Sequence, residues 1–151
     1  MKIRDKQDYN KQPITFAPDD TVRKALDLMC EKNIGSIIVT HPDDTIAGIV
    51  TERDMMLRVL GANKNPDKTK LSDIMSTNIR TANENDELID WLHVMSSERF
   101  RHLPIIDENK KLIGVMSQGD FVAHTWPDLN EKLKQDLKGR LGWTLQIPDF
   151  R

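Results

Sequence analysis

The chain has 151 residues, of which 38% are hydrophobic and 30% charged, as expected for one globular domain or two small intertwined ones. The formal net charge of -2 argues against a nucleic-acid partner, and the single cysteine, Cys30, excludes an internal disulfide and a multi-cysteine metal site. Because we find neither a signal peptide nor a run of about 18 apolar residues, we expect a cytoplasmic protein without a membrane partner.

The first part of the chain predicts a strand, a helix and two further strands. Residues 14–16 form a short extended stretch, and residues 18–21 have the composition of a turn that ends in a helix N-cap. The helix that follows has one apolar face at helical spacing, made by Val22, Ala25, Leu26 and Met29. Two apolar runs rich in β-branched residues, 36–40 and 45–50, then predict a pair of strands joined by a polar turn.

A second helix is expected directly after these strands. Thr51 has the chemistry of an N-cap, and Asp54 stands three positions later, as in a capping box. The helix runs toward Leu60. The polar residues 61–70, which include glycine, asparagine and proline, then indicate a linker.

The same pattern occurs twice. The spacing of Gly48, Thr51 and Asp54 returns 66 positions later in a second set, Gly114, Ser117 and Asp120. The same displacement, without a gap, relates Thr15 to Thr81, Asp20 to Asp86, Leu26 to Leu92 and Met29 to Met95. The chain is therefore an internal duplication of a β-α-β-β-α unit.

The second copy predicts its own set of elements. These are a strand at residues 79–81, a helix from Asp86 to about Glu98, strands at residues 102–106 and 112–116, and a helix that Ser117 caps and that stops before Trp126. Pro104 lies inside one of these strands. Because proline cannot donate a hydrogen bond to a sheet, it predicts an edge strand or a bulge near a functional opening.

One copy alone is marginal, since a unit of about 60 residues buries little surface. We therefore expect the copies to pack sheet to sheet around a shared core, with pseudo-twofold symmetry and two equivalent clefts between them. The predicted division is a first repeat with its N-terminal segment at 1–62, a linker at 63–74, a second repeat at 75–125 and a C-terminal extension at 126–151.

The C-terminal extension has an amphipathic pattern. Leucines recur every four residues at positions 129, 133, 137 and 141, with basic residues among them. This spacing predicts a helix that ends near Gly142. Its apolar face either packs on the rest of the chain or a dimer mate, or docks an effector protein.

With the repeated Gly-x-x-[Thr/Ser]-x-x-Asp elements in place, residues 14–123 resemble a tandem CBS-domain protein, also called a Bateman module. The resemblance implies an α+β (α/β) fold of two β-α-β-β-α CBS repeats with pseudo-twofold symmetry, followed here by the C-terminal helix. It also implies that an adenosine-containing ligand binds in the cleft between the repeats, and that two chains form a homodimer.

The repeated motif suits a nucleotide for physical reasons. A helix N-terminus offers unpaired N–H groups and a partial positive charge, so phosphate binds there readily. Thr51 and Ser117 could add a hydroxyl donor, and the resemblance implies that Asp54 and Asp120 accept hydrogen bonds from ribose hydroxyls. The alternative is that these four residues only cap their helices.

The two copies differ in the residues before their second strand. The second copy has Arg101 and His102, which suit phosphate, where the first has Gly35 and Ser36. The expected phosphate site is therefore made by four residues of the second copy, Arg101, His102, Ser117 and Asp120.

The other cleft is expected to be empty, weaker, or filled by the far end of a larger ligand such as NAD. It has Thr51, Arg53 and Asp54, and Arg53 either reaches a phosphate across the module or faces solvent. The resemblance places the base between the opening strand of one copy and the paired strands of the other. Candidate base contacts, each equally plausible as core, are Thr15, Phe16 and Ile37 for the charged cleft and Thr81 and Ile105 for the other.

We interpret the chain as a regulatory sensor that binds an adenine nucleotide. AMP is the expected ligand, with ATP, ADP, NAD or S-adenosylmethionine as alternatives, and no cofactor is required. We expect no enzymatic activity, because no nucleophile or hydrolytic motif is visible, and no metal site, because His41, His93 and His124 lack ligand spacing. An effector protein is a possible further partner, and the alternative function is an assembly module with degenerate ligand sites.

Overall fold

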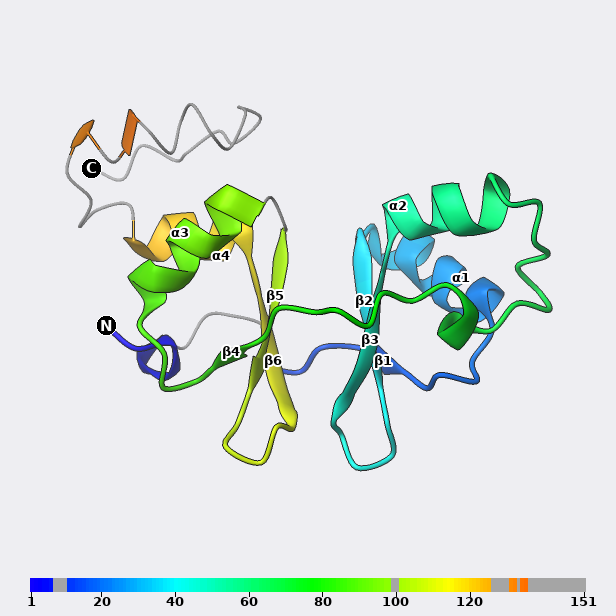
Figure 1. The fold of residues 1–151 in the computed structure, drawn as a ribbon, viewed down its shortest axis with the longest axis horizontal. Coiled ribbons are helices and arrows are strands. Elements are labelled where there is room, and N and C mark those ends of the chain that lie inside the picture. Colours follow the sequence, from blue (N-terminus) through cyan, green and yellow to red (C-terminus); the bar gives the residue numbers. More distant parts are fainter. Residues whose placement is uncertain (7–10, 99–100, 126–130, 133, 136–151) are drawn as a thin grey trace. The chain divides into compact units, whose positions relative to one another are not determined.

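The computed structural model describes residues 1–6, 11–98, 101–125, 131–132 and 134–135. The chain forms two compact units, each built around one of the repeats (Figure 1). The first-repeat unit comprises Gln12–Arg80 and the turn Asp107–Ile113. The second-repeat unit comprises Met1–Lys11, Thr81–Ile106 and the chain from Gly114 onward.

The first-repeat unit contains a three-stranded sheet in the order β1 (Thr15–Phe16), β2 (Ser36–Thr40) and β3 (Ile46–Thr51). β1 is parallel to β2, and β3 is antiparallel to it. The helices α1 (Val22–Lys32) and α2 (Glu52–Asp54) lie on one side of this sheet (Figure 1). The expected order of strand, helix, strand, strand and helix is confirmed.

The sequence explains where the helices of this unit begin and end. Thr21 Oγ1 accepts a hydrogen bond from the Lys24 N–H at 3.3 Å, which is the expected N-cap of α1. The helix ends at Asn33, which has the left-handed φ of 52° that is common at helix C-termini. The second helix reaches Leu60 as predicted, but after α2 it continues as a π-helix, η2 (Met55–Leu60).

The second-repeat unit has the same architecture. Its sheet has the order β4 (Ala82–Asn83), β5 (His102–Ile106) and β6 (Leu112–Ser117), with β4 parallel to β5. The helices α3 (Leu88–Glu98) and α4 (Gln118–Thr125) lie on one side of it (Figure 1). Two β-α-β-β-α repeats are therefore present, and the predicted duplication is confirmed.

The displacement of 66 residues also holds for strand pairing. Phe16 of β1 is paired with Val39, and Ala82 of β4 is paired with Ile105. β2 and β5 have the same length, and so do β3 and β6. Equivalent residues are therefore paired in both sheets, although β4 begins one position later in its repeat than β1.

The prediction of an edge strand at Pro104 is wrong. β5 is the middle strand of its sheet, and β4 pairs with it at Ile105 and Ile106. In the first-repeat unit the equivalent ladder starts one residue earlier, with Thr15 opposite Ile38. A proline has no N–H to donate, and the ladder between β4 and β5 begins just past Pro104.

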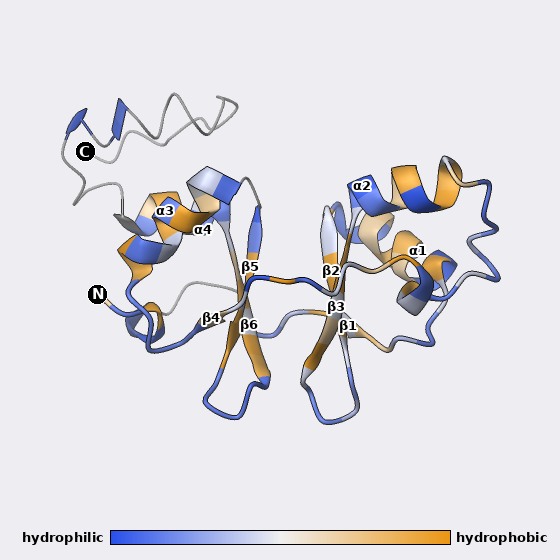
Figure 2. Cartoon of the chain, in the orientation of Figure 1, coloured by the Kyte–Doolittle hydropathy of each residue, from blue (hydrophilic) through white to orange (hydrophobic). Residues whose placement is uncertain are grey.

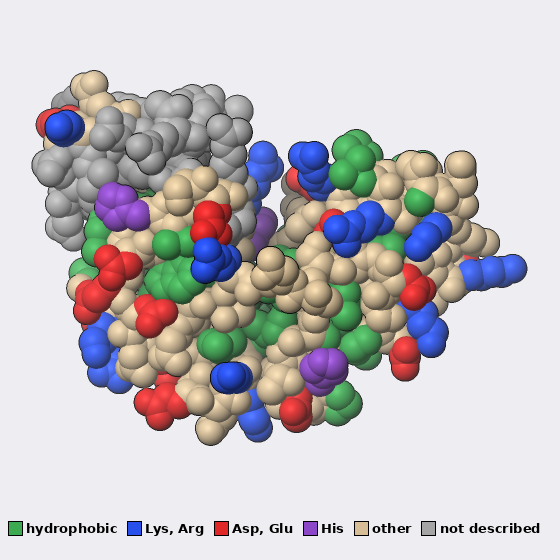
Figure 3. Space-filling model, viewed as in Figure 1, with side chains coloured by type: hydrophobic (Ala, Val, Ile, Leu, Met, Phe, Trp, Pro, Cys, Tyr) green, Lys and Arg blue, Asp and Glu red, His purple; other side chains and the backbone are tan. Residues whose placement is uncertain are grey.

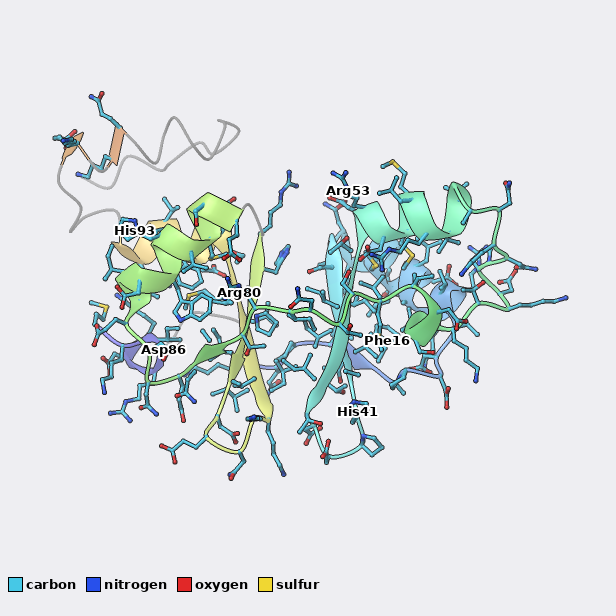
Figure 4. All side chains as sticks on the ribbon, in the orientation of Figure 1. Phe16, His41, Arg53, Arg80, Asp86 and His93 are labelled. Atoms are coloured by element: carbon cyan, nitrogen blue, oxygen red, sulfur yellow. The ribbon has the colours of Figure 1, made fainter. Side chains whose placement is uncertain are left out.

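Two predicted boundaries in the second copy are also corrected. The opening strand expected at residues 79–81 forms at Ala82–Asn83, and the helix expected from Asp86 begins at Leu88. Asp86 Oδ2 instead accepts hydrogen bonds from the Asn83 N–H at 2.9 Å and from Trp91 Nε1 at 2.8 Å. Asp86 therefore closes the turn before α3, where Figure 4 labels it, and is not part of the helix.

The core of the first-repeat unit draws on residues from outside its strands and helices. Its buried cluster contains apolar residues from β1, α1, β2, β3 and η2, and it is completed by Leu71 and Ile74. Leu71 opens a 3-10 turn, η3 (Leu71–Asp73), inside the stretch that we predicted as a polar linker. Figure 2 correspondingly shows many hydrophobic residues, in orange, in the strand pairs and in α1. A second 3-10 turn, η1 (Ile3–Asp5), buries Ile3 in the second-repeat unit.

The predicted C-terminal helix lies almost wholly outside the described residues. Those that are described there, 131–132 and 134–135, are helical. In the described part of the chain, no helix is long and apolar enough to cross a membrane.

Candidate functional site

Both repeats place a complete capping box at the start of their second helix. In the first repeat, Asp54 Oδ2 accepts hydrogen bonds from the Thr51 N–H at 2.9 Å and from the Thr51 hydroxyl at 3.1 Å. The Asp54 N–H in turn donates to Thr51 Oγ1 at 3.3 Å. In the second repeat, Asp120 Oδ2 accepts from the Ser117 N–H and hydroxyl at 2.7 Å each, and the Asp120 N–H donates to Ser117 Oγ at 3.1 Å.

These boxes bear on the predicted chemistry of the site. Each hydroxyl hydrogen is directed at the carboxylate, so an anion at this position would meet backbone N–H groups before it met a hydroxyl donor. Each carboxylate uses one oxygen, Oδ2, for the box. The second oxygen of Asp54 lies 3.7 Å from Arg58 Nε, whereas the second oxygen of Asp120 remains as an acceptor for another group. Capping and ligand binding are therefore compatible at Asp120, since they use different oxygens of one carboxylate.

The residues before the second strand lie at the same helix starts. The Gln118 N–H, the first of α4, donates to the Arg101 carbonyl at 2.8 Å. At the equivalent place in the first repeat, the Glu52 N–H donates to the Gly35 carbonyl at 2.9 Å. The second-repeat unit thus brings Arg101 and the first residue of β5, His102, to the helix start that carries the box.

The charged side chains at the two helix starts differ. A side chain at Gly35 would meet the carboxylate of Glu52 at 3.4 Å, so an acidic group lies against this glycine in the first repeat. In the second repeat the matching positions hold Arg101 and the neutral Gln118. The second start thus has an arginine in place of Gly35 and a neutral residue in place of Glu52.

Arg53 lies in the first turn of α2 and is exposed (Figure 4). A different arginine engages the Asp54 carboxylate. Arg58 Nε lies 3.7 Å from Asp54 Oδ1, and Arg58 Nη1 donates to the Ile74 carbonyl at 2.9 Å. Sequence reasoning missed Arg58, although its position four residues after Asp54 on a helix was a usable signal.

The predicted base contacts fall into two groups. Phe16, Ile37 and Ile105 are buried, and the first two belong to the core cluster of the first-repeat unit. Thr15 is exposed and Thr81 is half-buried. The burial of the three apolar residues matches their alternative interpretation as core, so their role toward a base stays a prediction.

Gly48 of the repeated motif has a packing role that the sequence did not indicate. A Cβ atom at this position would lie 2.6 Å from Met75 Sδ and 3.0 Å from Met75 Cβ. The strand therefore needs glycine here so that the linker can pass close to β3. Ile49 and Ser76 exchange backbone hydrogen bonds of 3.0 and 2.9 Å across the same contact.

The described residues contain no group of three histidine, cysteine, aspartate or glutamate side chains that could hold a metal ion. Two carboxylates away from the helix starts have a lowered pKa. The Lys24 ammonium holds the pKa of Asp20 below its ordinary value, and the Thr45 hydroxyl does the same for Asp43.

The fold is a duplicated β-α-β-β-α unit with a capped second helix in each copy, and comparison with known families agrees with this duplication. The sequence matches the CBS domain at residues 7–61 and again at residues 71–125. The chain therefore belongs to the CBS-domain family and carries two CBS domains in tandem.

Relatives and solved structures share this organisation. Protein MK0525 of Methanopyrus kandleri is 34% identical over 125 residues, which are 83% of this chain and 63% of that protein. The chain thus spans less than two thirds of this relative. The solved structure of a CBS-domain protein from Burkholderia ambifaria is 34% identical with a TM-score of 0.72, and the match covers 85% of this chain and 93% of that one.

Two more distant structures share the fold and hold adenosine compounds. One is CBSX2 in complex with AMP, at 22% identity and a TM-score of 0.71 over 84% of this chain and 97% of that one. The other is the CBS pair of protein MJ0100 with 5'-methylthioadenosine and S-adenosylmethionine, at 21% identity and a TM-score of 0.71 over 85% and 98%. At these identities the likeness shows the fold, and the bound compounds are those of the two proteins named.

CBS pairs also occur as regulatory parts of enzymes. The inosine-5'-monophosphate dehydrogenase of Methanocaldococcus jannaschii is 33% identical over 133 residues, which are 87% of this chain but 25% of that enzyme. The family matched here is regulatory in general and not catalytic.

Proposed function

We propose that this protein is a regulatory sensor that binds an adenine nucleotide through the second-repeat helix start. The observation that carries the proposal is the convergence of Arg101, the Ser117–Asp120 capping box and the N-terminus of α4 in one unit. Arg101 and the helix N-terminus hold phosphate, and the second oxygen of Asp120 accepts from the ribose. His102 adds a donor beside them.

AMP is the ligand we favour, because a single phosphate suits one helix start with one arginine. ATP, ADP, NAD and S-adenosylmethionine are the alternatives. We place the ligand in a cleft between pseudo-twofold-related repeats, with Thr15, Phe16 and Ile37 toward the base. Thr51, Arg53, Asp54, Thr81 and Ile105 line the second cleft. The AMP complex of CBSX2 and the adenosine compounds bound by protein MJ0100 support this choice.

Titration calorimetry with each of the five compounds tests the proposal. Asp120→Asn keeps an oxygen for the capping box but weakens the acceptor for ribose, so it should lower the affinity for AMP at least tenfold. Asp54→Asn is the matched control, because it makes the same change at the first-repeat helix start and should leave that affinity within about twofold. Absence of heat with all five compounds at millimolar concentration would contradict the proposal.

The charge of Arg101 gives a second test. A charge-assisted hydrogen bond contributes about 1.5–3 kcal/mol, so Arg101→Gln should weaken AMP binding about tenfold or more. Arg53→Gln removes an exposed arginine from the other helix start and serves as the control. If both variants lose affinity for AMP equally, the phosphate does not bind preferentially at the second-repeat helix start, and this part of the proposal is wrong.

We also propose that the chain is a cytoplasmic homodimer without enzymatic activity. The π-helix η2 exposes Met56, Leu57 and Leu60 by 56%, 52% and 77%, and hydrophobic side chains emerge at the surface of this unit in Figure 3. Such a face is typical of an association surface. Sedimentation should therefore give a dimer that Leu60→Glu weakens, and AMP incubated with the protein should be recovered intact.

The alternative function, an assembly module with degenerate ligand sites, makes the opposite prediction for Asp120. Under that alternative, Asp120→Asn changes stability slightly and no compound binds. An effector protein remains a proposed further partner in either case, and the C-terminal extension is the segment we assign to it.

A further inference from the structure

The two units each hold one short segment that comes from outside their repeat. The second-repeat unit holds residues 1–6, which contain η1, and the first-repeat unit holds residues 69–74, which contain η3. We call these segments the N-terminal brace and the linker brace. Both contain the pattern lysine, aliphatic residue, any residue, aspartate.

The two braces fold in the same way. Asp5 Oδ2 accepts from the Lys2 N–H at 3.0 Å, and Asp73 Oδ2 accepts from the Lys70 N–H at 3.1 Å. Each aspartate N–H donates back to the lysine carbonyl, at 3.1 and 3.0 Å. Both segments therefore close the same turn with the same hydrogen bonds.

Each brace is also bound in the same way by its unit. The N-terminal brace donates from the Ile3 N–H to the Asp86 carbonyl at 3.0 Å and from the Arg4 N–H to the Glu84 carbonyl at 2.9 Å. The linker brace makes the equivalent bonds, Leu71 to Asp20 at 2.9 Å and Ser72 to Pro18 at 3.0 Å. The acceptors of the two sets are 66 positions apart, so the two grooves are the same feature of the repeat.

The braces complete both a helix and a core. The first N–H of α3, that of Leu88, donates to the Met1 carbonyl at 2.9 Å, and the first N–H of α1, that of Val22, donates to the Thr69 carbonyl at 2.8 Å. The side chains of Ile3 and Leu71 are fully buried. Each groove therefore selects an aliphatic side chain and satisfies helix N–H groups that would otherwise lack a partner.

The groove of the second-repeat unit differs in charge. Its binding turn, 84–87, holds three acidic residues, Glu84, Asp86 and Glu87, whereas the equivalent turn, 18–21, holds two, Asp19 and Asp20. The N-terminal brace is correspondingly basic, with Lys2, Arg4 and Lys6 around Asp5, and Lys2 forms a β-bridge with Glu87. The more basic brace therefore lies in the more acidic groove.

We propose that the groove of the second-repeat unit is a docking site for the N-terminal brace of a second copy of this chain. The brace contacts described above are made to the second-repeat unit, whereas the chain beyond the brace, from Gln12, belongs to the first-repeat unit. A brace from another copy can therefore make the same hydrogen bonds, bury the same aliphatic side chain and meet the same acidic turn. Exchange of an identical segment adds no new contact and removes none, so it needs little free energy.

Isotope mixing with zero-length cross-linking tests the exchange on the full chain. Equal amounts of ¹⁴N- and ¹⁵N-labelled protein are incubated together over a range of concentrations and then treated with a carbodiimide. The reagent joins the N-terminal amine of Met1 to Glu87, because the amine nitrogen lies 2.7 Å from Glu87 Oε2. Exchange predicts cross-linked peptides with one light and one heavy half, approaching about half of the product at complete exchange.

The chain supplies an internal control for this experiment. Lys70 Nζ lies 3.1 Å from Asp19 Oδ1 within the first-repeat unit, so the same reagent joins the linker brace to its groove. The linker brace is tethered inside one contiguous stretch, Gln12–Arg80, and its cross-link should stay isotopically pure. Pure isotopes in the Glu87 cross-link at every concentration, including after a cycle of partial unfolding, would overturn the proposal. Ile3→Asp should abolish the Glu87 cross-link in both its pure and mixed forms.

Discussion

The second helices of the two repeats begin alike and then diverge. Both start with a hydroxyl–aspartate capping box, but in the first repeat Glu52 lies against Gly35, whereas in the second repeat Arg101 occupies the place of Gly35. The capping box is thus common to both copies, whereas the charged residues around it differ. The comparison teaches that the fold needs the box in both units, while ligand preference depends on residues outside the box.

The helices also differ after their first turn. In the first repeat the chain widens into η2, and Gly61 N–H bonds to the Met56 carbonyl at 2.8 Å, five residues back. There Arg58 connects Asp54 to the linker carbonyl of Ile74. In the second repeat α4 remains α-helical to Thr125. Arg58 therefore connects the first helix start to the linker. This start thus has a structural contact that is specific to the first repeat.

The largest expected effects are losses of stability caused by substitutions in the two braces, and each loss should be confined to one unit. Leu71→Ala and Ile3→Ala each remove a buried aliphatic side chain and should cost about 2–5 kcal/mol of unfolding free energy. We expect hydrogen exchange to rise in the first-repeat unit for Leu71→Ala and in the second-repeat unit for Ile3→Ala. Uniform loss of protection in both units by either variant would mean that the units do not unfold separately.

A smaller effect is expected from the glycine of the first motif. Gly48→Ala places a methyl group 2.6 Å from Met75 Sδ and should cost about 1–3 kcal/mol through overpacking. Gly119→Ala is the matched control in the second-repeat unit, because its nearest neighbour would lie 3.7 Å away and alanine favours a helix. Denaturant titration measures the free energy of unfolding of both variants. Equal changes would show that Met75 of the linker can move aside at little cost.

The capping boxes should contribute similarly to both helices. Thr51→Ala and Ser117→Ala each remove the hydroxyl that accepts the aspartate N–H, at a cost of about 1 kcal/mol. Thermal unfolding should show equal losses, whereas AMP affinity should respond more strongly to Ser117→Ala. A larger effect of Thr51→Ala on AMP would reverse our assignment of the two helix starts.

The smallest expected effect is a pH dependence at Asp20. The Lys24 ammonium lies 2.8 Å from Asp20 Oδ1, and this hydrogen bond lowers the pKa of Asp20 from its ordinary 3.8. A lowered pKa in the folded state means that the stabilisation is fully present above pH 3.8 and is lost as the pH falls through the folded value. The pair is exposed and spaced i,i+4, so it contributes about 0.5 kcal/mol or less.

Asp20→Asn should therefore reduce stability at neutral pH and have a progressively smaller effect below pH 3.8. Urea titrations at several pH values measure the difference between the variant and the natural chain. A difference that grows toward acid pH would assign the opposite sign to this carboxylate.

The sequence alone was sufficient to predict the helices, the strands and the internal duplication. Turn chemistry at Thr21 predicted the first helix start, and the β-branched run 36–40 predicted β2. The displacement of 66 extended the second of these predictions to β5. The capping boxes were also predicted, because the spacing of Thr51 and Asp54 is a local property of the backbone. Local hydrogen bonding and periodicity decide these features, and both are written in short stretches of sequence.

Tertiary structure decided what joins distant parts of the chain. Nothing within residues 1–6 indicated that Ile3 would be buried beside Asp86, and the polar composition of the linker concealed the core residues Leu71 and Ile74. The middle position of Pro104 in its sheet likewise depended on β4, which pairs just past the proline. Such contacts link residues that are tens of positions apart, and burial across that separation is set by packing, which no local pattern encodes.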